Sequence, residues 1–216
     1  NNNNNNPVTA IFGGRGASTL TCPRCGYTSA TEEPFLDLSL EPKASIVHAL
    51  AAFTAPEKLD ARNAWRCGGC GEAVRATKRL GIAKAPESLV VHLKRFDARG
   101  RVARKVDAHV RFDARLDLET TTPGQKAGYA LVGVLVHHGA STHSGHYTAF
   151  CKGRGGVWAS FDDDVVRACG DKEVMRQKAY MLFYARDTKP PLSVVSRKRA
   201  ASIDSDAPID LPPRPP

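Results

Sequence analysis

The sequence predicts an α+β domain that is built mainly on an antiparallel sheet and stapled at one end by a metal. Two observations carry this prediction: a succession of strand-like apolar segments between residues 88 and 186, and two matched Cys-x-x-Cys-Gly motifs at 22–26 and 67–71. A third is that only one segment, residues 44–53, has a clear helical period. Many short strands with little helix favour an antiparallel sheet rather than alternating β-α-β units.

The strand predictions come from β-branched and aromatic residues between Gly, Pro and Asp breaks. The segment YALVGVLV (129–136) is apolar on both faces, so we expect it to be a central strand that needs helical cover on at least one side. The predicted strands are FLDLSLEP (35–42), SLVVHLKRF (88–96), KVDAHVRF (105–112), YALVGVLVHHG (129–139), HYTAFCKG (146–153), VWASFDD (157–163) and AYMLFYAR (179–186).

One helix is predicted at ASIVHALAAF (44–53). Its apolar residues Ile46, Leu50 and Phe53 recur at i, i+4 and i+7, which places them on one helical face, and Pro56 follows the end. The stretch AIFGGRGASTLTCPRCGYTS (10–29) is expected to be a turn and a strand that leads into the first knuckle, and AWRCGGCGEAVRATKRLGIAKAP (64–86) a hairpin with the second knuckle at its turn.

Composition bounds the class of protein. The 216 residues are 42% hydrophobic and 25% charged, which supports one main domain, expected at 7–187. We expect the Asn run 1–6 and the Pro-rich tail 188–216 to be disordered. No apolar run reaches the roughly 18 residues needed to cross a bilayer, and no signal peptide is recognisable, so an intracellular soluble protein without membrane contact is expected.

The formal net charge of +9 is concentrated in residues 94–115, where eight Lys/Arg oppose three Asp, a local charge of +5. The spacing indicates strands with outward basic side chains, so a solvated face is the main interpretation and nucleic-acid binding the lesser alternative. The tail segment SRKRA (196–200) is compatible with nuclear import or with a solvated linker, which leaves cytoplasm or nucleus open.

Four of the six cysteines form the two knuckles, Cys22 and Cys25 with Gly26, and Cys67 and Cys70 with Gly71. Two such knuckles match a tetrahedral zinc site with four thiolate ligands, since each glycine can take the positive φ that turns the backbone amides toward the sulfurs. A dithiol redox motif and a pair of disulfides are the alternatives. Cys151 and Cys169 are expected to be small buried residues.

The stretches HSGHYTAF (143–150) and VWASFDDDVV (157–166) indicate half of a nucleophilic catalytic site. If their strands form a hairpin, His146 at the start of one and Asp162 at the end of the other lie side by side, as a general base and its orienting carboxylate require. Gly145 would let a substrate chain pass close, and Tyr147 would pack over the catalytic histidine. A histidine satisfied structurally is the alternative.

These motifs together resemble the ubiquitin-specific protease family, the papain-like cysteine deubiquitinases, over residues 8–187. The resemblance implies a papain-like fold with zinc-stapled fingers and a palm sheet, and thiol-dependent hydrolysis of the isopeptide bond at the terminal glycine of ubiquitin. The landmarks are IFGG (11–14), CPRCG (22–26), FLDLSLE (35–41), WRCGGCG (65–71), LVVHLKRF (89–96), YALVGVLVHHG, SGHYTAF (144–150), VWASFDDDVV and AYMLFYAR.

The resemblance also implies roles for single residues. His146 would be the catalytic base, Asp162 its partner and Asp163 a supporting acid, while the four knuckle cysteines would bind structural zinc in fingers that grip ubiquitin. The loop 137–145 would border the channel for the ubiquitin tail, with substrate-binding residues Ser144, Gly145, Tyr147 and His143, the last of these a loop residue rather than the base. Ubiquitin and ubiquitinated proteins are the implied partners.

The chain departs from the family at one point. The family's cysteine box, which resembles GNTCYxN and supplies the nucleophile, has no counterpart here. We therefore expect the nucleophile and the N-terminal helical part to lie upstream, and expect this chain alone to be inactive. A catalytically inactive ubiquitin-binding scaffold is the first alternative, and a zinc-dependent nucleic-acid module is the second.

Overall fold

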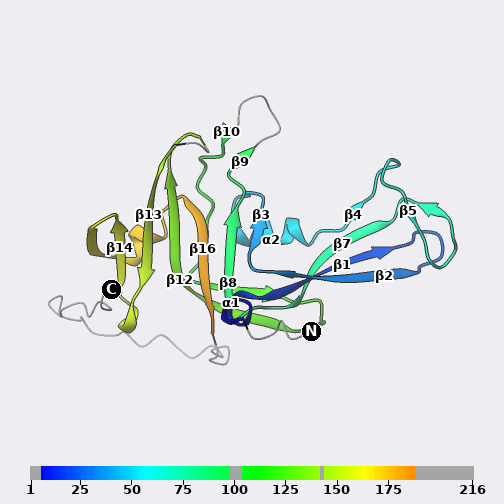
Figure 1. Cartoon of the computed structure of the whole chain (residues 1–216), viewed down its shortest axis with the longest axis horizontal. Coiled ribbons are helices and arrows are strands. Elements are labelled where there is room, and N and C mark those ends of the chain that lie inside the picture. The colour runs from blue at the N-terminus through cyan, green and yellow to red at the C-terminus, as the bar shows by residue number, and fades with distance from the viewer. Residues whose placement is uncertain (1–5, 98–103, 142–143, 188–216) are drawn as a thin grey trace.

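A computed structural model describes residues 6–97, 104–141 and 144–187. The chain forms two parts, a large sheet and a long finger that extends away from it (Figure 1). The finger consists of residues 14–35 and 55–84, which are separated in the sequence by residues 36–54, a stretch that includes one strand of the large sheet and a helix. The predicted α+β class with a mainly antiparallel sheet is confirmed.

The large sheet has eight strands, in the order β15-β14-β13-β12-β16-β8-β3, with β11 added beside β12. All neighbours in it are antiparallel except β3 and β8. The predicted central strand is β12, which pairs with β13 on one side and β16 on the other. The strands are β3 Leu38–Leu40, β8 Ser88–Leu93, β11 Arg115–Glu119, β12 Lys126–His138, β13 His146–Lys152, β14 Trp158–Asp162, β15 Val165–Cys169 and β16 Ala179–Arg186.

The hydrophobic core lies against this sheet. Along β12 every second side chain from Ala127 to Leu131 is buried, so one face of the strand packs inward over its first half. Helix α2, Ile46–Phe53, adds Ile46 and Ala49 to the core, and the Ser45 hydroxyl caps its N-terminus by accepting from the amide of His48 at 3.2 Å. The sheet thereby holds the ends of β12, β13 and β14 in fixed register.

The finger is long and thinly packed. Its main sheet has the order β2-β1-β7-β4, and a two-stranded ribbon of β5 and β6 continues it to the tip. Among its described residues the buried apolar side chains are few: Cys22, Cys67, Ala76 and Ile82. The strands are β1 Gly14–Thr21, β2 Thr28–Phe35, β4 Glu57–Lys58, β5 Trp65–Arg66, β6 Ala73–Val74 and β7 Thr77–Lys84.

Two local elements differ from the sequence pattern. Asn6 is the N-cap of α1, Pro7–Phe12, where its side chain accepts from the amide of Val8 at 2.9 Å. A capping Asn followed by Pro at the first helical position explains this helix. Within FLDLSLEP only 38–40 is a strand of the large sheet, and Leu36 is exposed.

The segment KVDAHVRF is also not a strand. Only β10, Arg104–Lys105, pairs with β9, Phe96–Asp97, and 106–110 forms no ladder. The buried Arg95 guanidinium forms hydrogen bonds with the backbone of this segment: its Nη1 donates to the carbonyls of Val106 at 2.7 Å and Ala108 at 2.8 Å. Side-chain donors thus replace the neighbouring strand that the sequence pattern led us to expect.

The remaining small elements were not predicted. They are β11, β15, the 3₁₀ turn Arg154–Gly156 and the short helix α3, Asp171–Val174. No helix of the described residues is long and apolar enough to cross a membrane. The predictions for residues 1–5, His143, the tail 188–216 and SRKRA lie outside the described residues.

Candidate functional site

The tip of the finger brings the four knuckle cysteines together. The loop between β1 and β2 and the loop between β5 and β6 have the same local structure, since Gly26 and Gly71 take φ of +73° and +74°. Their amides donate to the carbonyls of Cys22 and Cys67 at 3.0 and 2.9 Å. Each knuckle is therefore closed by the positive φ that the sequence predicted for its glycine.

The sulfur atoms are spaced as a tetrahedral metal site requires. Cys22 Sγ lies 4.0 Å from Cys70 Sγ, Cys25 Sγ lies 3.6 Å from Cys67 Sγ, and all four sulfurs lie within 4.8 Å of one another. A tetrahedron with Zn–S bonds of about 2.3 Å has edges of about 3.8 Å. None of the six cysteines is in a disulfide, so the four-thiol cluster fits zinc and not a pair of disulfides.

Aromatic packing joins the two knuckles. Tyr27 stacks on Trp65 with 6.3 Å between ring centroids and 13° between ring planes. A Cβ added to Gly69 would lie 2.8 Å from the Cβ of Tyr27, so only glycine allows this approach. Arg24 and Glu72 form an exposed ion pair of 3.4 Å between the same loops. These contacts hold the loops in register but bury little apolar surface.

The second cluster lies at the ends of two neighbouring strands of the large sheet, where His146 opens β13 and Asp162 closes β14. His146 Nε2 is 2.5 Å from Asp162 Oδ1, and both side chains are exposed. With Nε2 engaged by the carboxylate, Nδ1 is the ring nitrogen left for a reacting group. This arrangement is that of a base held in one tautomer by an acid.

The register of the hairpin explains the pair. Ala149 is opposite Phe161 and Phe150 opposite Ser160, so continuing the register places Thr148 opposite Asp162. His146 lies two residues beyond Thr148 and therefore on the same face, which makes His146 and Asp162 diagonal neighbours. The sequence expectation that the two strands form a hairpin is confirmed.

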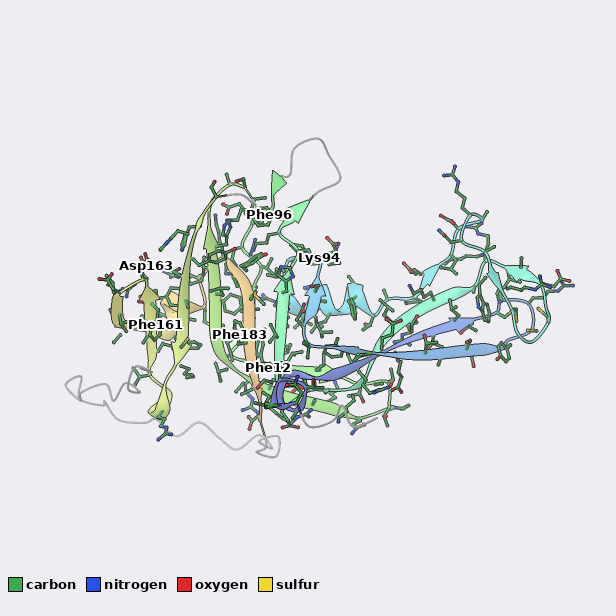
Figure 2. All side chains as sticks on the ribbon, in the orientation of Figure 1. Phe12, Lys94, Phe96, Phe161, Asp163 and Phe183 are labelled. Carbon is green, nitrogen blue, oxygen red and sulfur yellow. The ribbon has the colours of Figure 1, made fainter. Side chains whose placement is uncertain are left out.

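Asp163 also lies close to the imidazole. Regular strand alternation would turn its carboxylate to the other face, yet ligand atoms of His146, Asp162 and Asp163 all lie within 4.8 Å of one another. The chain has left the strand here, because Asp163 and Asp164 form the two-residue loop between β14 and β15, and Asp163 has a φ of 50°. Figure 2 shows Asp163 beside Phe161 at this end of the sheet.

The hydrogen bond that the His146 ring donates to Asp162 raises the pKa of His146, and the charges of Asp163 and Asp162 act in the same direction. An NMR titration of the imidazole is therefore expected to give a pKa above the ordinary value of 6.5. Asp162→Ala should lower it most and Asp163→Ala less. Because the folded pKa is the higher one, the contribution of His146 to stability is present below pH 6.5 and disappears as pH rises through the folded pKa. An equal effect of both substitutions would contradict this order.

The other predicted site residues surround this pair. Gly145 and Ser144 are exposed immediately before His146, and Ser144 Oγ lies 3.2 Å from Ser141 Oγ. Tyr147 does not pack over His146 as expected: its ring lies against His137, with centroids 4.8 Å apart. Neighbouring residues of a strand point to opposite faces, which accounts for the difference.

A cleft of about 850 Å³ opens beside the end of β12. Its walls are His137–Ala140, Lys105 with Asp107, and Arg176–Lys178. The sequence interpretation placed His137 only at the start of the loop that borders the channel and gave no role to Lys105. The sequence clue that was missed is the pair of glycines, Gly139 and Gly145, at the two ends of the loop. A side chain can approach the backbone this closely only where the residue is glycine.

Neither remaining cysteine lies at the His146–Asp162 pair. Cys151 is five residues further along β13, about 16 Å at the strand rise, and Cys169 pairs with Trp158 at the opposite end of β14. Cys151 is exposed, so its predicted burial was wrong, while Cys169 is partly buried against the core. The chain thus presents a base and an acid with no thiol of its own beside them.

The comparisons with known proteins agree with this geometry. The profile of the family described as ubiquitin carboxyl-terminal hydrolase matches residues 1–184. Ubiquitin carboxyl-terminal hydrolase 23 of Arabidopsis thaliana is 45% identical over 186 residues, which cover 83% of this chain and 21% of the relative. The probable ubiquitin carboxyl-terminal hydrolase 16 of Schizosaccharomyces pombe is 39% identical, with 83% of this chain and 40% of the relative covered.

Solved structures show the same fold. The SAGA DUB module of Ubp8, Sgf11, Sus1 and Sgf73 bound to monoubiquitin matches with a TM-score of 0.79 at 37% identity, covering 84% of this chain and 42% of that chain. The same module bound to ubiquitin aldehyde matches with a TM-score of 0.79 at 34% identity, covering 87% and 44%. The chain spans less than half the length of each of these relatives.

Proposed function

Because this chain belongs to the ubiquitin carboxyl-terminal hydrolase family, we propose that it carries the base and the acid of a thiol-dependent deubiquitinase. The observation that carries the proposal is the contact of His146 Nε2 with Asp162 Oδ1 at 2.5 Å, which leaves Nδ1 for a cysteine thiol. The bond cleaved is the isopeptide bond after the terminal glycine of ubiquitin.

In the proposed reaction Nδ1 of His146 takes the proton of the thiol, and the thiolate attacks the glycine carbonyl. The imidazolium then gives that proton to the leaving lysine amine, which leaves a thioester between the enzyme and ubiquitin. His146 next takes a proton from water, whose oxygen attacks the thioester. The imidazolium returns this proton to the departing thiolate, and ubiquitin leaves with a free carboxylate. Asp162 holds the tautomer and stabilises the imidazolium, and Asp163 adds negative charge nearby.

The nucleophile in this proposal comes from another part of the complete protein. Four of the six cysteines converge at the finger tip, and Cys151 and Cys169 lie at the far ends of their strands. That the chain spans only 21–44% of the length of the relatives and solved structures named above supports a longer catalytic unit. The absence of a thiol near His146 is also the observation that keeps a ubiquitin-binding scaffold as the second candidate.

We further propose that the four finger thiolates hold one structural zinc and that the finger binds the folded body of ubiquitin. A zinc ion bound there would cross-link the two knuckle loops, which bury very few apolar side chains. Support comes from the sulfur spacing of 3.6–4.0 Å and from the similarity to modules crystallised with ubiquitin. Cys22 and Cys67 would bind the zinc from the buried side of the site, and Cys25 would bind it from the exposed side.

The isolated chain is expected to bind ubiquitin without reacting with it. A ubiquitin probe with a thiol-reactive C-terminus should label none of its cysteines, while titration of ¹⁵N-labelled ubiquitin should perturb a contiguous surface. Loss of that perturbation on zinc removal would support binding by the finger. Covalent labelling at Cys151 or Cys169 would overturn the assignment of an external nucleophile.

One experiment distinguishes the proposal of an active deubiquitinase from that of an inactive ubiquitin-binding scaffold. A longer protein that contains this chain and the rest of its catalytic domain should cleave a fluorogenic ubiquitin substrate, and His146→Ala should abolish the cleavage. If that protein binds ubiquitin but has no turnover, the scaffold is the better description. Binding of DNA or RNA with a steep salt dependence and no binding of ubiquitin would favour the nucleic-acid alternative.

A further inference from the structure

His137 is a buried histidine outside the proposed proton-transfer pair. It lies on β12 directly opposite Tyr147, only 6% of it is exposed, and its ring is surrounded by aromatic rings. The ring centroids of Phe96, Tyr147 and Tyr180 lie at 5.4, 4.8 and 6.0 Å. Nδ1 is buried and has no hydrogen-bond partner among the described residues. Burial first, then the charges of Lys105 and His138, lowers the pKa of His137, which favours the neutral ring.

The two glycines that bracket the loop 139–145 close over this ring. A Cβ added to Gly145 would lie 2.1 Å from His137 Nε2, and one added to Gly139 would lie 3.1 Å from His137 Cε1. The same Cβ on Gly139 would meet the carbonyl oxygen of Ser144 at 2.6 Å. Both ends of the loop are therefore in van der Waals contact with each other or with the imidazole, and a larger side chain at either glycine has no room.

Lys105 fixes the same region through the backbone. Its Nζ donates to the carbonyl of His137 at 2.6 Å and to that of Gly139 at 2.8 Å. It reaches these atoms from β10, an element that is far away in the sequence and not part of the large sheet. The end of β12 is thus held by a charge-assisted donor on one side and by packing against Gly145 on the other.

We propose that His137 is a positioning residue for His146: its ring is the surface on which Gly145 rests, and this contact sets where β13 begins and keeps His146 on Asp162. The inference rests on the proposed function, because it assigns a role within that site. Gly145 is bonded directly to His146, and the imidazole itself is about half exposed, with a tilted ring contact to His138 at 6.3 Å between centroids. A displacement of about 1 Å at a catalytic group costs about 10²-fold in rate.

The first test is the NMR titration of His146 in the isolated, zinc-loaded chain, which needs no turnover. His137→Ala removes the ring under Gly145, and the pKa of His146 is expected to move down, in the direction that Asp162→Ala produces. His137→Gln keeps a side chain that reaches the position of Nε2 and should restore part of the shift. Phe96→Leu is the matched control, since Phe96 packs in the same aromatic cluster without meeting either glycine: it should lower the melting temperature and leave the titration of His146 unchanged.

The second test uses the longer, active protein. His137→Ala should lower kcat by about tenfold to 10²-fold with KM for the ubiquitin substrate nearly unchanged. If His137→Ala lowers stability as Phe96→Leu does and leaves both the His146 titration and kcat unaltered, His137 is only a core residue and the proposal is wrong. If every longer protein is inactive, the proposed function fails while the titration still decides this inference.

Gly145→Ala keeps the test decisive if His137→Ala does not fold. The added methyl group collides with His137 Nε2 and with the carbonyl of His138, so the start of β13 must move while the His137 ring stays in place. The His146 pKa is then expected to fall as in His137→Ala. A folded Gly145→Ala variant with an unchanged His146 titration would overturn the proposal.

Discussion

Replacing both buried knuckle cysteines, Cys22→Ser with Cys67→Ser, is expected to abolish zinc binding and to unfold the tip of the finger. Elemental analysis should fall from one zinc per chain to none, and hydrogen exchange should become fast across 20–35 and 58–76. The large sheet should keep its protection, because its core does not include the finger tip. A chelator should give the same pattern in the unsubstituted chain, as should a pH low enough to protonate the thiolates.

The size of this effect follows from how little else holds the tip. Strands β5 and β6 have two residues each, and two of the four buried apolar side chains of the described finger are the cysteines Cys22 and Cys67 themselves. Isolated two-stranded ribbons are marginal in water. Structural zinc contributes about 10–16 kcal/mol of apparent binding free energy in small zinc domains, as much as the whole stability of an ordinary domain.

The control for this experiment is Cys151→Ser, which removes an exposed thiol on β13 and should leave both zinc content and exchange unchanged. The proposed site would be wrong if purified chain carried no stoichiometric zinc. It would also be wrong if the double variant kept the protection of the finger tip, because the tip would then be held by its own packing.

In the longer protein that supplies the thiol, His146→Ala is expected to reduce kcat by about 10³-fold or more, since general base catalysis and thiol activation are lost together. Asp162→Ala should cost about 10²-fold or more, because it releases the ring nitrogen that the 2.5 Å contact holds. Ubiquitin binding should persist in both variants, so the losses should lie in kcat and not in KM.

Asp163→Ala is the discriminating companion to Asp162→Ala. The Asp163 carboxylate lies near the imidazole but in the hairpin loop, and its influence on the pKa of His146 is through its charge. We expect a clearly smaller loss of kcat than for Asp162→Ala. If Asp163→Ala is inactive and Asp162→Ala retains most activity, Asp163 is the orienting acid. Steady-state kinetics with a fluorogenic ubiquitin substrate would decide between the two.

The sequence by itself determined the features that depend on local chemistry and short period. The knuckles CPRCG and CGGCG predicted a four-thiol cluster, because the ligand spacing and the following glycine are set within five residues. His146 begins one strand and Asp162 ends the next. If the two strands form a hairpin, this order alone places the two side chains next to each other. The apolar run of 129–136 likewise predicted the central strand β12.

Only the tertiary structure decided the features that depend on residues distant in the sequence. KVDAHVRF has the pattern of a strand, but the Arg95 side chain donates hydrogen bonds to two of its carbonyls. The local sequence pattern does not predict a donor from another segment. The loop geometry at Asp163 brings a second carboxylate to His146, although strand alternation predicts the opposite direction. The contact of His137 with Gly145 and the clamp by Lys105 join three segments that fold together only when the sheet has formed. Periodicity reports which face a side chain is on, whereas packing between segments fixes what it touches.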